Sequence, residues 1–254
     1  VATCMCPAGR WLWRNVLGEG VRLLSDRRAP VAGRREPKAA VVKEGPCRRA
    51  RRVRSAPACR VAAVHRAVGH LFDCDEVLGE GGFGVVLRAT SRTLGYECGL
   101  KVVAVSANSE REASVHGDLR HRNIAQLIDT FVIGASRYFA IELCDGGELF
   151  DEIKLQDRLA ERDAKAVFKQ MLSAVSHMHT HGVAHRDLKL ENFLFERRGV
   201  PLVENNLKLI DFGFATRFTP GCRNMKTRCG SRCYAAPEIF LAMQYDERCD
   251  IFSC

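Results

Sequence analysis

The chain has 254 residues, of which 46% are hydrophobic, and 39 Lys and Arg outweigh 30 Asp and Glu. This length suits one hydrophobic core with an appendage and is short for two domains. There is no apolar run near the ~18 residues that cross a bilayer, and no charged-then-apolar start typical of a secretory signal. We therefore expect a soluble cytoplasmic protein without a membrane partner.

The positive charge is concentrated in residues 1–69, which hold 16 Lys and Arg against 4 Asp and Glu, whereas residues 70–254 hold 23 against 26. Because residues 1–69 are rich in Arg, Ala, Pro and Gly, we expect a disordered basic tail. Its charge is compatible with nuclear entry or nucleic-acid binding, but its aromatic residues are limited to Trp11 and Trp13. Nucleic-acid binding is therefore the weaker hypothesis.

The spacing of the cysteines does not indicate a disulfide framework. Twelve occur at irregular spacings without a Cys-x-x-Cys pair, so reduced thiols are favoured over disulfides or a zinc site.

Alternating apolar residues broken by glycines begin near Asp75 and predict an antiparallel sheet. Residues 79–86 (GEGGFGVV) place several glycines where backbone amides could approach a phosphate, although a structural hairpin can be equally rich in glycine. Lys101 follows twenty residues after Gly81 in an apolar strand. Alone, such a lysine would be read as an edge residue facing water.

A further apolar strand, residues 138–144, ends in the polar turn 145–149 (DGGEL). Residues 159–181 then predict a long helix, and burial explains its apolar stripe better than a ligand does. His177, His179 and His181 are interpreted as ordinary helix residues. The predicted buried face consists of Ala166, Phe168, Met171, Leu172, Val175, Met178 and His179.

The most informative stretch is residues 185–192 (HRDLKLEN), followed by residues 211–213 (DFG). Together they supply a carboxylate that can accept a hydroxyl proton and two metal-binding side chains, which is equipment for phosphoryl transfer. From about Phe72 to its end the sequence resembles a eukaryotic protein kinase. Lys189 indicates the serine/threonine type, and the wording of several motifs is most similar to the calcium/calmodulin-dependent and energy-sensing group.

This resemblance implies an α+β fold of two lobes spanning residues 70–254, with a small antiparallel-sheet lobe and a helical large lobe. It implies Asp187 as the catalytic carboxylate, Lys189 beside the transferred phosphoryl group, and Asn192 with Asp211 as Mg²⁺ ligands. Ile141 would be the gatekeeper of the adenine pocket. The ATP site would comprise Leu78, Gly79, Gly81, Gly82, Phe83, Gly84, Val86, Lys101, Glu112, Glu142, Cys144 and Glu148.

The sequence departs from the family pattern at two places near the nucleotide. Lys101 and Glu112, the expected ion pair, are only eleven residues apart, so the first helical turn would be missing or its loop compressed. His116 stands where such kinases place an apolar residue against the Phe of the DFG motif, and a buried imidazole needs a partner. Both departures predict a poorly assembled resting state.

The segment from Asp211 to Glu238 resembles an activation segment. Thr227 matches the site that an upstream kinase phosphorylates, Arg186 would pair with the phosphate, and Ser231 would contact Asp187 and Lys189. The protein substrates would carry basic residues near the target Ser or Thr, attracted by Glu148 and Glu191.

The chain ends in residues 250–254, which resemble the start of a central helix of the large lobe, with Asp250 placed to brace the catalytic loop. We therefore expect an incomplete large lobe. The alternative to an active kinase is a catalytically silent, kinase-like scaffold.

Overall fold

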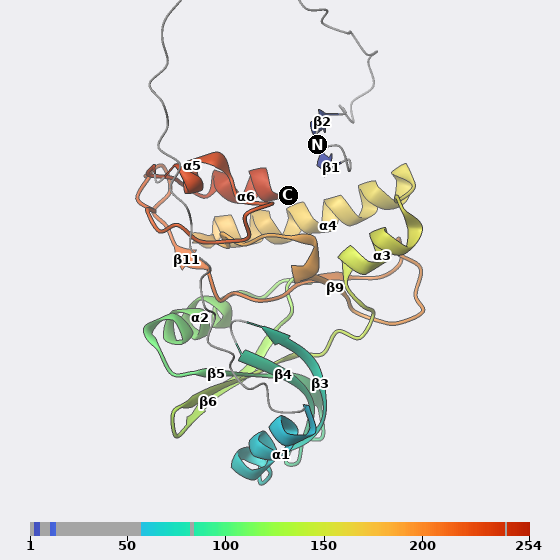
Figure 1. Ribbon diagram of the computed structural model, residues 1–254, viewed down its shortest axis with the longest axis vertical. Helices are drawn as coiled ribbons and strands as arrows, with labels where there is room; N and C mark the ends of the chain where they lie inside the picture. Colours follow the sequence, from blue (N-terminus) through green and yellow to red (C-terminus); the bar gives the residue numbers. More distant parts are fainter. Residues whose placement is uncertain (1–2, 6–10, 14–56, 82–83, 242) are drawn as a thin grey trace, which may run out of the picture. The chain divides into compact units, whose positions relative to one another are not determined.

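The computed structural model describes residues 3–5, 11–13, 57–81, 84–241 and 243–254 (Figure 1). The chain divides into two compact units, residues 1–52 and 53–254. In the first unit, β1 (Thr3–Met5) pairs antiparallel with β2 (Trp11–Trp13). Most of the predicted basic tail, residues 14–56, lies outside the described residues.

The small lobe is built on a five-stranded antiparallel sheet in the order β3-β4-β5-β7-β6. Burial alternates residue by residue along β4, as expected for a strand whose apolar side chains share one face. The sheet predicted from alternating residues is therefore confirmed. Its strands are β3 (Phe72–Gly81), β4 (Gly84–Ser91), β5 (Glu97–Ala104), β6 (Leu127–Ile133) and β7 (Ser136–Glu142).

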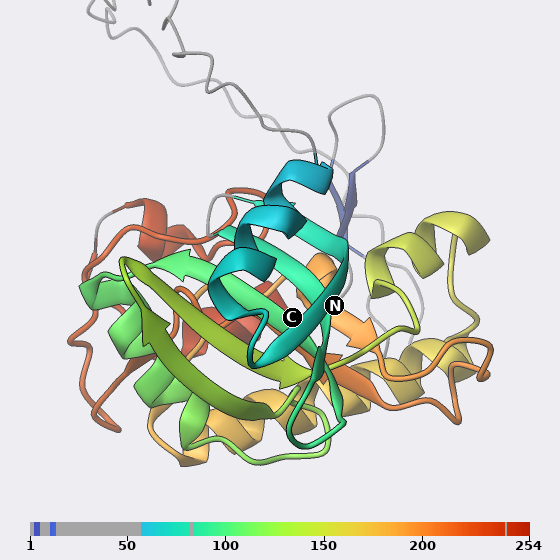
Figure 2. The same cartoon turned by 90° about the horizontal axis from the view of Figure 1, so that it is seen from below.

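A helix that the sequence analysis did not predict precedes the sheet. Helix α1 (Pro57–Val68) lies on the face of the sheet remote from the large lobe (Figures 1 and 2). Val64 and Val68 are buried there with Phe72, Leu87 and other sheet residues. Residues 57–68 therefore belong to the packed small lobe and not to the tail, because Val61, Val64, Ala67 and Val68 supply an apolar helical face.

The connection between β5 and helix α2 (Ala107–Gly117) explains the short interval from Lys101 to Glu112. Only Val105 and Ser106 separate the two elements. The Ser106 hydroxyl accepts a hydrogen bond from the Ser109 N–H, and the Ser109 hydroxyl accepts one from the Ser106 N–H. This capping box satisfies the first helical turn, so the loop is compressed and the helix begins without a defect.

The large lobe contains helices and two short two-stranded antiparallel sheets. Its core joins Leu149, Met171, Met178, Leu188 and Phe212 with further buried side chains. The elements are α3 (Leu149–Gln156), α4 (Glu161–Thr180), β8 (Val183–Ala184), η1 (Leu190–Asn192), β9 (Phe193–Phe195), β10 (Leu207–Leu209), β11 (Thr216–Arg217), α5 (Pro237–Phe240) and α6 (Arg248–Ser253).

Helix α4 confirms the predicted helix of residues 159–181, but its buried face is rotated from the predicted one. Val167, Met171, Ala174, Val175 and Met178 are buried. Phe168 and Leu172, which were predicted to be buried, are 39% and 36% exposed. Among the described residues, no helix is both long and apolar enough to cross a membrane.

Candidate active site

A cleft between the two lobes collects most of the predicted site residues. Lys189, Asn192 and Asp211 line it from the large lobe, and Ile141 lies in its wall as predicted for the gatekeeper. Gly82 and Phe83 lie outside the described residues. The predicted nucleotide residues that line the cleft are Leu78, Gly79, Gly81, Gly84, Val86, Lys101, Glu142, Cys144 and Glu148.

The glycines of the loop between β3 and β4 are required for two different structural reasons. Gly84 has φ +136°, and a Cβ atom there would lie 2.0 Å from the Val102 carbonyl oxygen, so a side chain is excluded. Gly79 and Gly81 have no atom within 4 Å of the corresponding position. Their lack of a side chain leaves open space over the cleft, as a phosphate-binding loop requires.

Lys101 is held between two carboxylates. Its Nζ lies 2.6 Å from Glu112 Oε1 and 2.7 Å from Asp211 Oδ1. Burial alone would lower the pKa of Lys101, but Asp211 and Glu112 raise it above its ordinary value. Glu112 is 4% exposed and lies behind Lys101, where it orients the lysine without lining the cleft. The ion pair is therefore formed, contrary to the expected poor assembly.

The segment that follows β7 and joins the two lobes is held in place by the side chain of Glu142, the last residue of β7. Lys208 Nζ donates to Glu142 Oε1 at 2.6 Å, and the Gln126 N–H donates to Glu142 Oε2 at 3.0 Å. The Glu142 N–H is itself bonded to the Gln126 carbonyl at 2.8 Å. That N–H is consequently occupied, so a nucleotide would have to use other main-chain groups of residues 142–144.

The Asp187 carboxylate points toward two groups of the large lobe. Its Oδ1 accepts a hydrogen bond from the Ser231 N–H at 2.7 Å, and its Oδ2 lies 3.7 Å from Lys189 Nζ. The predicted contact of Ser231 with Asp187 is thus confirmed and runs through the main chain. A carboxylate held in this way by a donor and a nearby cation stays oriented to accept the proton of an incoming hydroxyl.

Asp250 braces the catalytic loop as predicted. Its buried carboxylate accepts the N–H groups of His185 at 2.8 Å and of Arg186 at 2.7 Å, and it lies 2.9 Å from His179 Nε2. Arg186 has φ +68° and Asp211 has φ +63°. Such positive φ values are unfavourable for side chains with a Cβ atom and occur where the surroundings fix a functional loop.

Asn192 and Asp211 fit a Mg²⁺ site by donor type, since an amide and a carboxylate oxygen are hard ligands. The Asn192 Nδ2 donates to the Asp187 carbonyl at 2.9 Å, which leaves the amide oxygen for a cation. The Ile210 N–H donates to the Asn192 carbonyl at 2.9 Å, which ties this loop to the residue before Asp211. The hydrogen bond to the Asp187 carbonyl restricts the Asn192 side chain, and the ion pair with Lys101 restricts that of Asp211.

His116 has one of the two partners that its ring requires. Its Nε2 lies 2.7 Å from the Ala125 carbonyl oxygen and therefore donates a proton, whereas Nδ1 is buried without a partner. The ring stacks on Phe212 with centroids 4.4 Å apart. Burial lowers the pKa of His116 to about 4. A neutral imidazole thus replaces an apolar contact.

The activation segment carries Thr227 with an exposed side chain. The Arg186 guanidinium donates to the Phe214 carbonyl from Nε at 2.9 Å and from Nη2 at 2.7 Å. The Arg111 Nε donates to the Ala215 carbonyl at 3.0 Å, which links helix α2 to the same segment.

Sequence reasoning missed Leu194 among the cleft residues. It lies between Phe193 and Phe195, which are buried in the large-lobe core, whereas Leu194 lines the cleft. The period of two along a strand was the available signal, because neighbours of core residues point to the opposite face. Asp151 and Glu191 also line the cleft.

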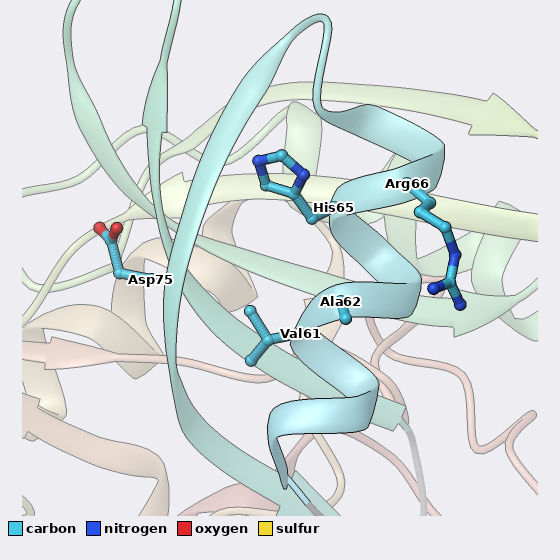
Figure 3. A pocket seen from close by; sticks show the side chains of 5 residues that line it. All are labelled: Val61, Ala62, His65, Arg66 and Asp75. Carbon is cyan, nitrogen blue, oxygen red and sulfur yellow. The ribbon is translucent and has the colours of Figure 1, made fainter.

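A separate depression lies between α1 and β3, where Val61, Ala62, His65, Arg66 and Asp75 line it (Figure 3). None of the predicted catalytic or nucleotide residues is among them. Lys101, Lys189, Asn192 and Asp211 line the interlobe cleft instead, and Asp187 lies beside Lys189. This arrangement fits the class of two-lobed phosphotransferases.

Comparison with known proteins agrees with this class. Residues 72–254 match the family described as "Protein kinase domain". The chain is 36% identical over 205 residues to the human hormonally up-regulated neu tumor-associated kinase, covering 74% of this chain and 27% of that protein. It is 38% identical over 183 residues to a probable myosin light chain kinase of Dictyostelium discoideum, covering 69% and 46%.

A third relative, calcium-dependent protein kinase 4 of Plasmodium berghei, is 37% identical over 187 residues, covering 70% of this chain and 35% of that protein. The chain thus spans between about a quarter and a half of the length of these relatives. The chain belongs to the protein kinase family, and the named relatives fit the predicted serine/threonine type of the calcium/calmodulin-dependent group.

Proposed function

We propose that the protein transfers the γ-phosphoryl group of ATP to Ser or Thr hydroxyls of protein substrates. The observation that carries this proposal is the position of Lys101 at the cleft, bonded to Glu112 and to Asp211 in one buried network. Such a network holds a cation where the nucleotide phosphates would enter and fixes helix α2 at the same time. A silent scaffold would not need these charges to be buried together.

The catalytic steps assigned to the chain's own residues follow from their positions. Asp187 orients the substrate hydroxyl and accepts its proton, while Lys189 stabilises the negative charge that develops on the transferred group. Asn192 and Asp211 would hold Mg²⁺, which supplies charge neutralisation on the phosphates when bound. Glu112 keeps the Lys101 ammonium directed at the cleft.

The test is Asp187→Asn, which keeps the shape of the side chain and removes the proton acceptor. We expect phosphate transfer from ATP to a Ser/Thr peptide to fall at least 100-fold with an unchanged midpoint of unfolding. Asp75→Asn, an exposed change on β3, is the matched control. Retained turnover in the Asp187 variant, after contaminating kinases are excluded, would remove Asp187 from the mechanism.

We also propose that the substrates carry Arg or Lys on the N-terminal side of the target residue. Burial raises the pKa of Glu148, and the nearby carboxylates of Asp151 and Glu191 raise it further. A substrate cation beside Glu148 would offset the unfavourable surroundings of its charge.

This preference is tested with peptides that differ only in an upstream Arg, Ala or Glu. We expect Glu148→Gln to lower kcat/KM for the Arg peptide by roughly 10-fold and to leave the Ala peptide almost unchanged. Glu161→Gln, at the exposed start of α4, is the control. Equal use of all three peptides by the unaltered protein would contradict the proposal.

We further propose that an upstream kinase phosphorylates Thr227 and thereby raises activity. The exposed Thr227 side chain supports accessibility, and Arg186 lies within the catalytic loop where a phosphate could pair with its guanidinium. Because the Lys101 to Glu112 pair is already formed, we expect a moderate increase in kcat. Equal kcat for the phosphorylated protein and Thr227→Ala would refute this switch and leave the kinase assignment intact.

A further inference from the structure

Tyr245 lies where the activation segment meets the catalytic loop. Its side chain is 2% exposed and packs with Met225, Ile239 and Cys249. Its hydroxyl donates to the Thr227 carbonyl oxygen at 2.6 Å and accepts a hydrogen bond from Arg186 Nη1 at 3.3 Å. One oxygen atom therefore joins the main chain of the activation segment to the guanidinium beside the catalytic carboxylate.

The main chain of Tyr245 also forms hydrogen bonds with the activation segment, at Met225. The Tyr245 N–H donates to the Met225 carbonyl at 3.0 Å, and the Met225 N–H donates to the Tyr245 carbonyl at 3.2 Å. Arg223 Nε lies 3.4 Å from the Asp246 carboxylate. These contacts fix residues 223–225, so the hydroxyl of Tyr245 is the contact that extends the docking to Thr227.

The hydrogen bond between Tyr245 and Thr227 is linked to the catalytic carboxylate through the next four residues of the chain. The Ser231 N–H, four positions after Thr227, donates to Asp187 Oδ1 at 2.7 Å. Between them, Gly230 has φ +91° and packs so closely on the Arg186 carbonyl that a Cβ atom would lie 2.4 Å from its oxygen. A displacement of Thr227 would thus be transmitted to the donor that orients Asp187.

We propose that Tyr245 is a positioning residue for phosphoryl transfer, whose hydroxyl holds Thr227 against Arg186 and so keeps the Ser231 N–H on Asp187 while the Thr227 side chain is unmodified. This inference rests on the proposed kinase function. A phosphate on Thr227 would supply a second link to Arg186 and make the hydroxyl dispensable. Burial raises the pKa of Tyr245 to about 12, so the phenol keeps the proton that it donates.

The test is Tyr245→Phe, which removes one oxygen atom and keeps the ring in its cluster. Steady-state kinetics and amide hydrogen exchange are measured with Thr227 unmodified and with phosphothreonine incorporated at that position. With Thr227 unmodified, kcat should fall roughly 5- to 10-fold because the Thr227 carbonyl and the Arg186 guanidinium both lose the tyrosine hydroxyl as a hydrogen-bond partner. The KM for ATP should stay unchanged, and amides of residues 225–231 should exchange faster.

With phosphothreonine at position 227, the variant and the unaltered protein should agree within about 2-fold, since the phosphate restores the link to Arg186. Tyr138→Phe, a buried tyrosine of the small lobe that does not touch the activation segment, is the control and should change neither readout.

Two results would overturn the proposal. In one, Tyr245→Phe keeps the kcat and the exchange rates of the unaltered protein. In the other, it loses activity equally in both phosphorylation states, which would mean that the hydroxyl only stabilises the fold. If no form of the protein transfers phosphate, the kinase function fails, while hydrogen exchange of residues 225–231 still decides the positioning role.

Discussion

Replacing His116 with Leu should make the stability of the kinase domain less dependent on pH. The folded pKa of His116 is about 4, against about 6.5 for an unperturbed histidine. Between these values the unfolded chain binds a proton that the folded state excludes, so the folded state loses stability as pH falls below about 6.5. From pH 7.5 to pH 5 this group alone removes about 2 kcal/mol from the free energy of unfolding.

Three charged or titratable groups outside helix α2 face the ring: Lys101 from β5, Asp211 after β10 and His185 from the catalytic loop. Of these, Lys101 and His185 lower the pKa of His116, and Asp211 raises it. They remain in the Leu variant, so the difference between the two proteins isolates the His116 titration. His116→Leu should therefore gain about 2 kcal/mol relative to the unaltered protein at pH 5 compared with pH 7.5.

The assay is urea unfolding followed by far-UV circular dichroism at several pH values and fixed ionic strength. Tryptophan fluorescence would not report on the kinase domain, because the only two tryptophans are Trp11 and Trp13. His70→Leu, at an exposed histidine, is the control and should follow the unaltered protein. Parallel pH curves for His116→Leu and the unaltered protein would refute the reasoning.

Two further substitutions test the packing. Val68→Ala in helix α1 should lower the free energy of unfolding by about 2 kcal/mol in urea titrations, because two buried methyl groups are lost and a cavity remains. Ala63→Ser, at an exposed position of the same helix, is the control. If Val68→Ala is as neutral as this control, α1 does not pack on the sheet. Asp250→Asn should lower the unfolding midpoint and reduce kcat at least about 10-fold. Each oxygen of the carboxylate accepts one N–H, from His185 and from Arg186, and an amide has only one such oxygen. An unchanged kcat would show that the catalytic loop does not depend on Asp250.

The motif residues were predictable because phosphoryl transfer demands particular side chains in a particular order. Asp187, Asn192, Asp211 and Lys101 could be predicted from sequence. The structure places Lys101, Asn192 and Asp211 in one cleft, with Asp187 3.7 Å from the cleft residue Lys189. The sheet and helix α4 were predictable from their periods of hydrophobic residues. The rotated face of α4 was not, because periodicity states which side is apolar and not which part of it another element covers.

Helix α1 shows why composition misled at the domain boundary. The charge of residues 1–69 is dominated by arginines before position 55, and it concealed a short apolar helical pattern after Pro57. Whether such a weakly amphipathic stretch is helical depends on a surface that receives it, and that surface is the outer face of the sheet.

The sequence by itself indicated the family, predicted the catalytic and metal-binding residues, and showed the departure at His116, because each depends on side-chain chemistry at a fixed position in a motif. Only the tertiary structure decided how His116 is accommodated, which carbonyl receives its proton, and that Tyr245 joins Thr227 to Arg186. The physical reason is that these contacts join residues that no local pattern relates. A buried donor is satisfied by whichever acceptor the fold brings within hydrogen-bonding distance, and that choice belongs to packing.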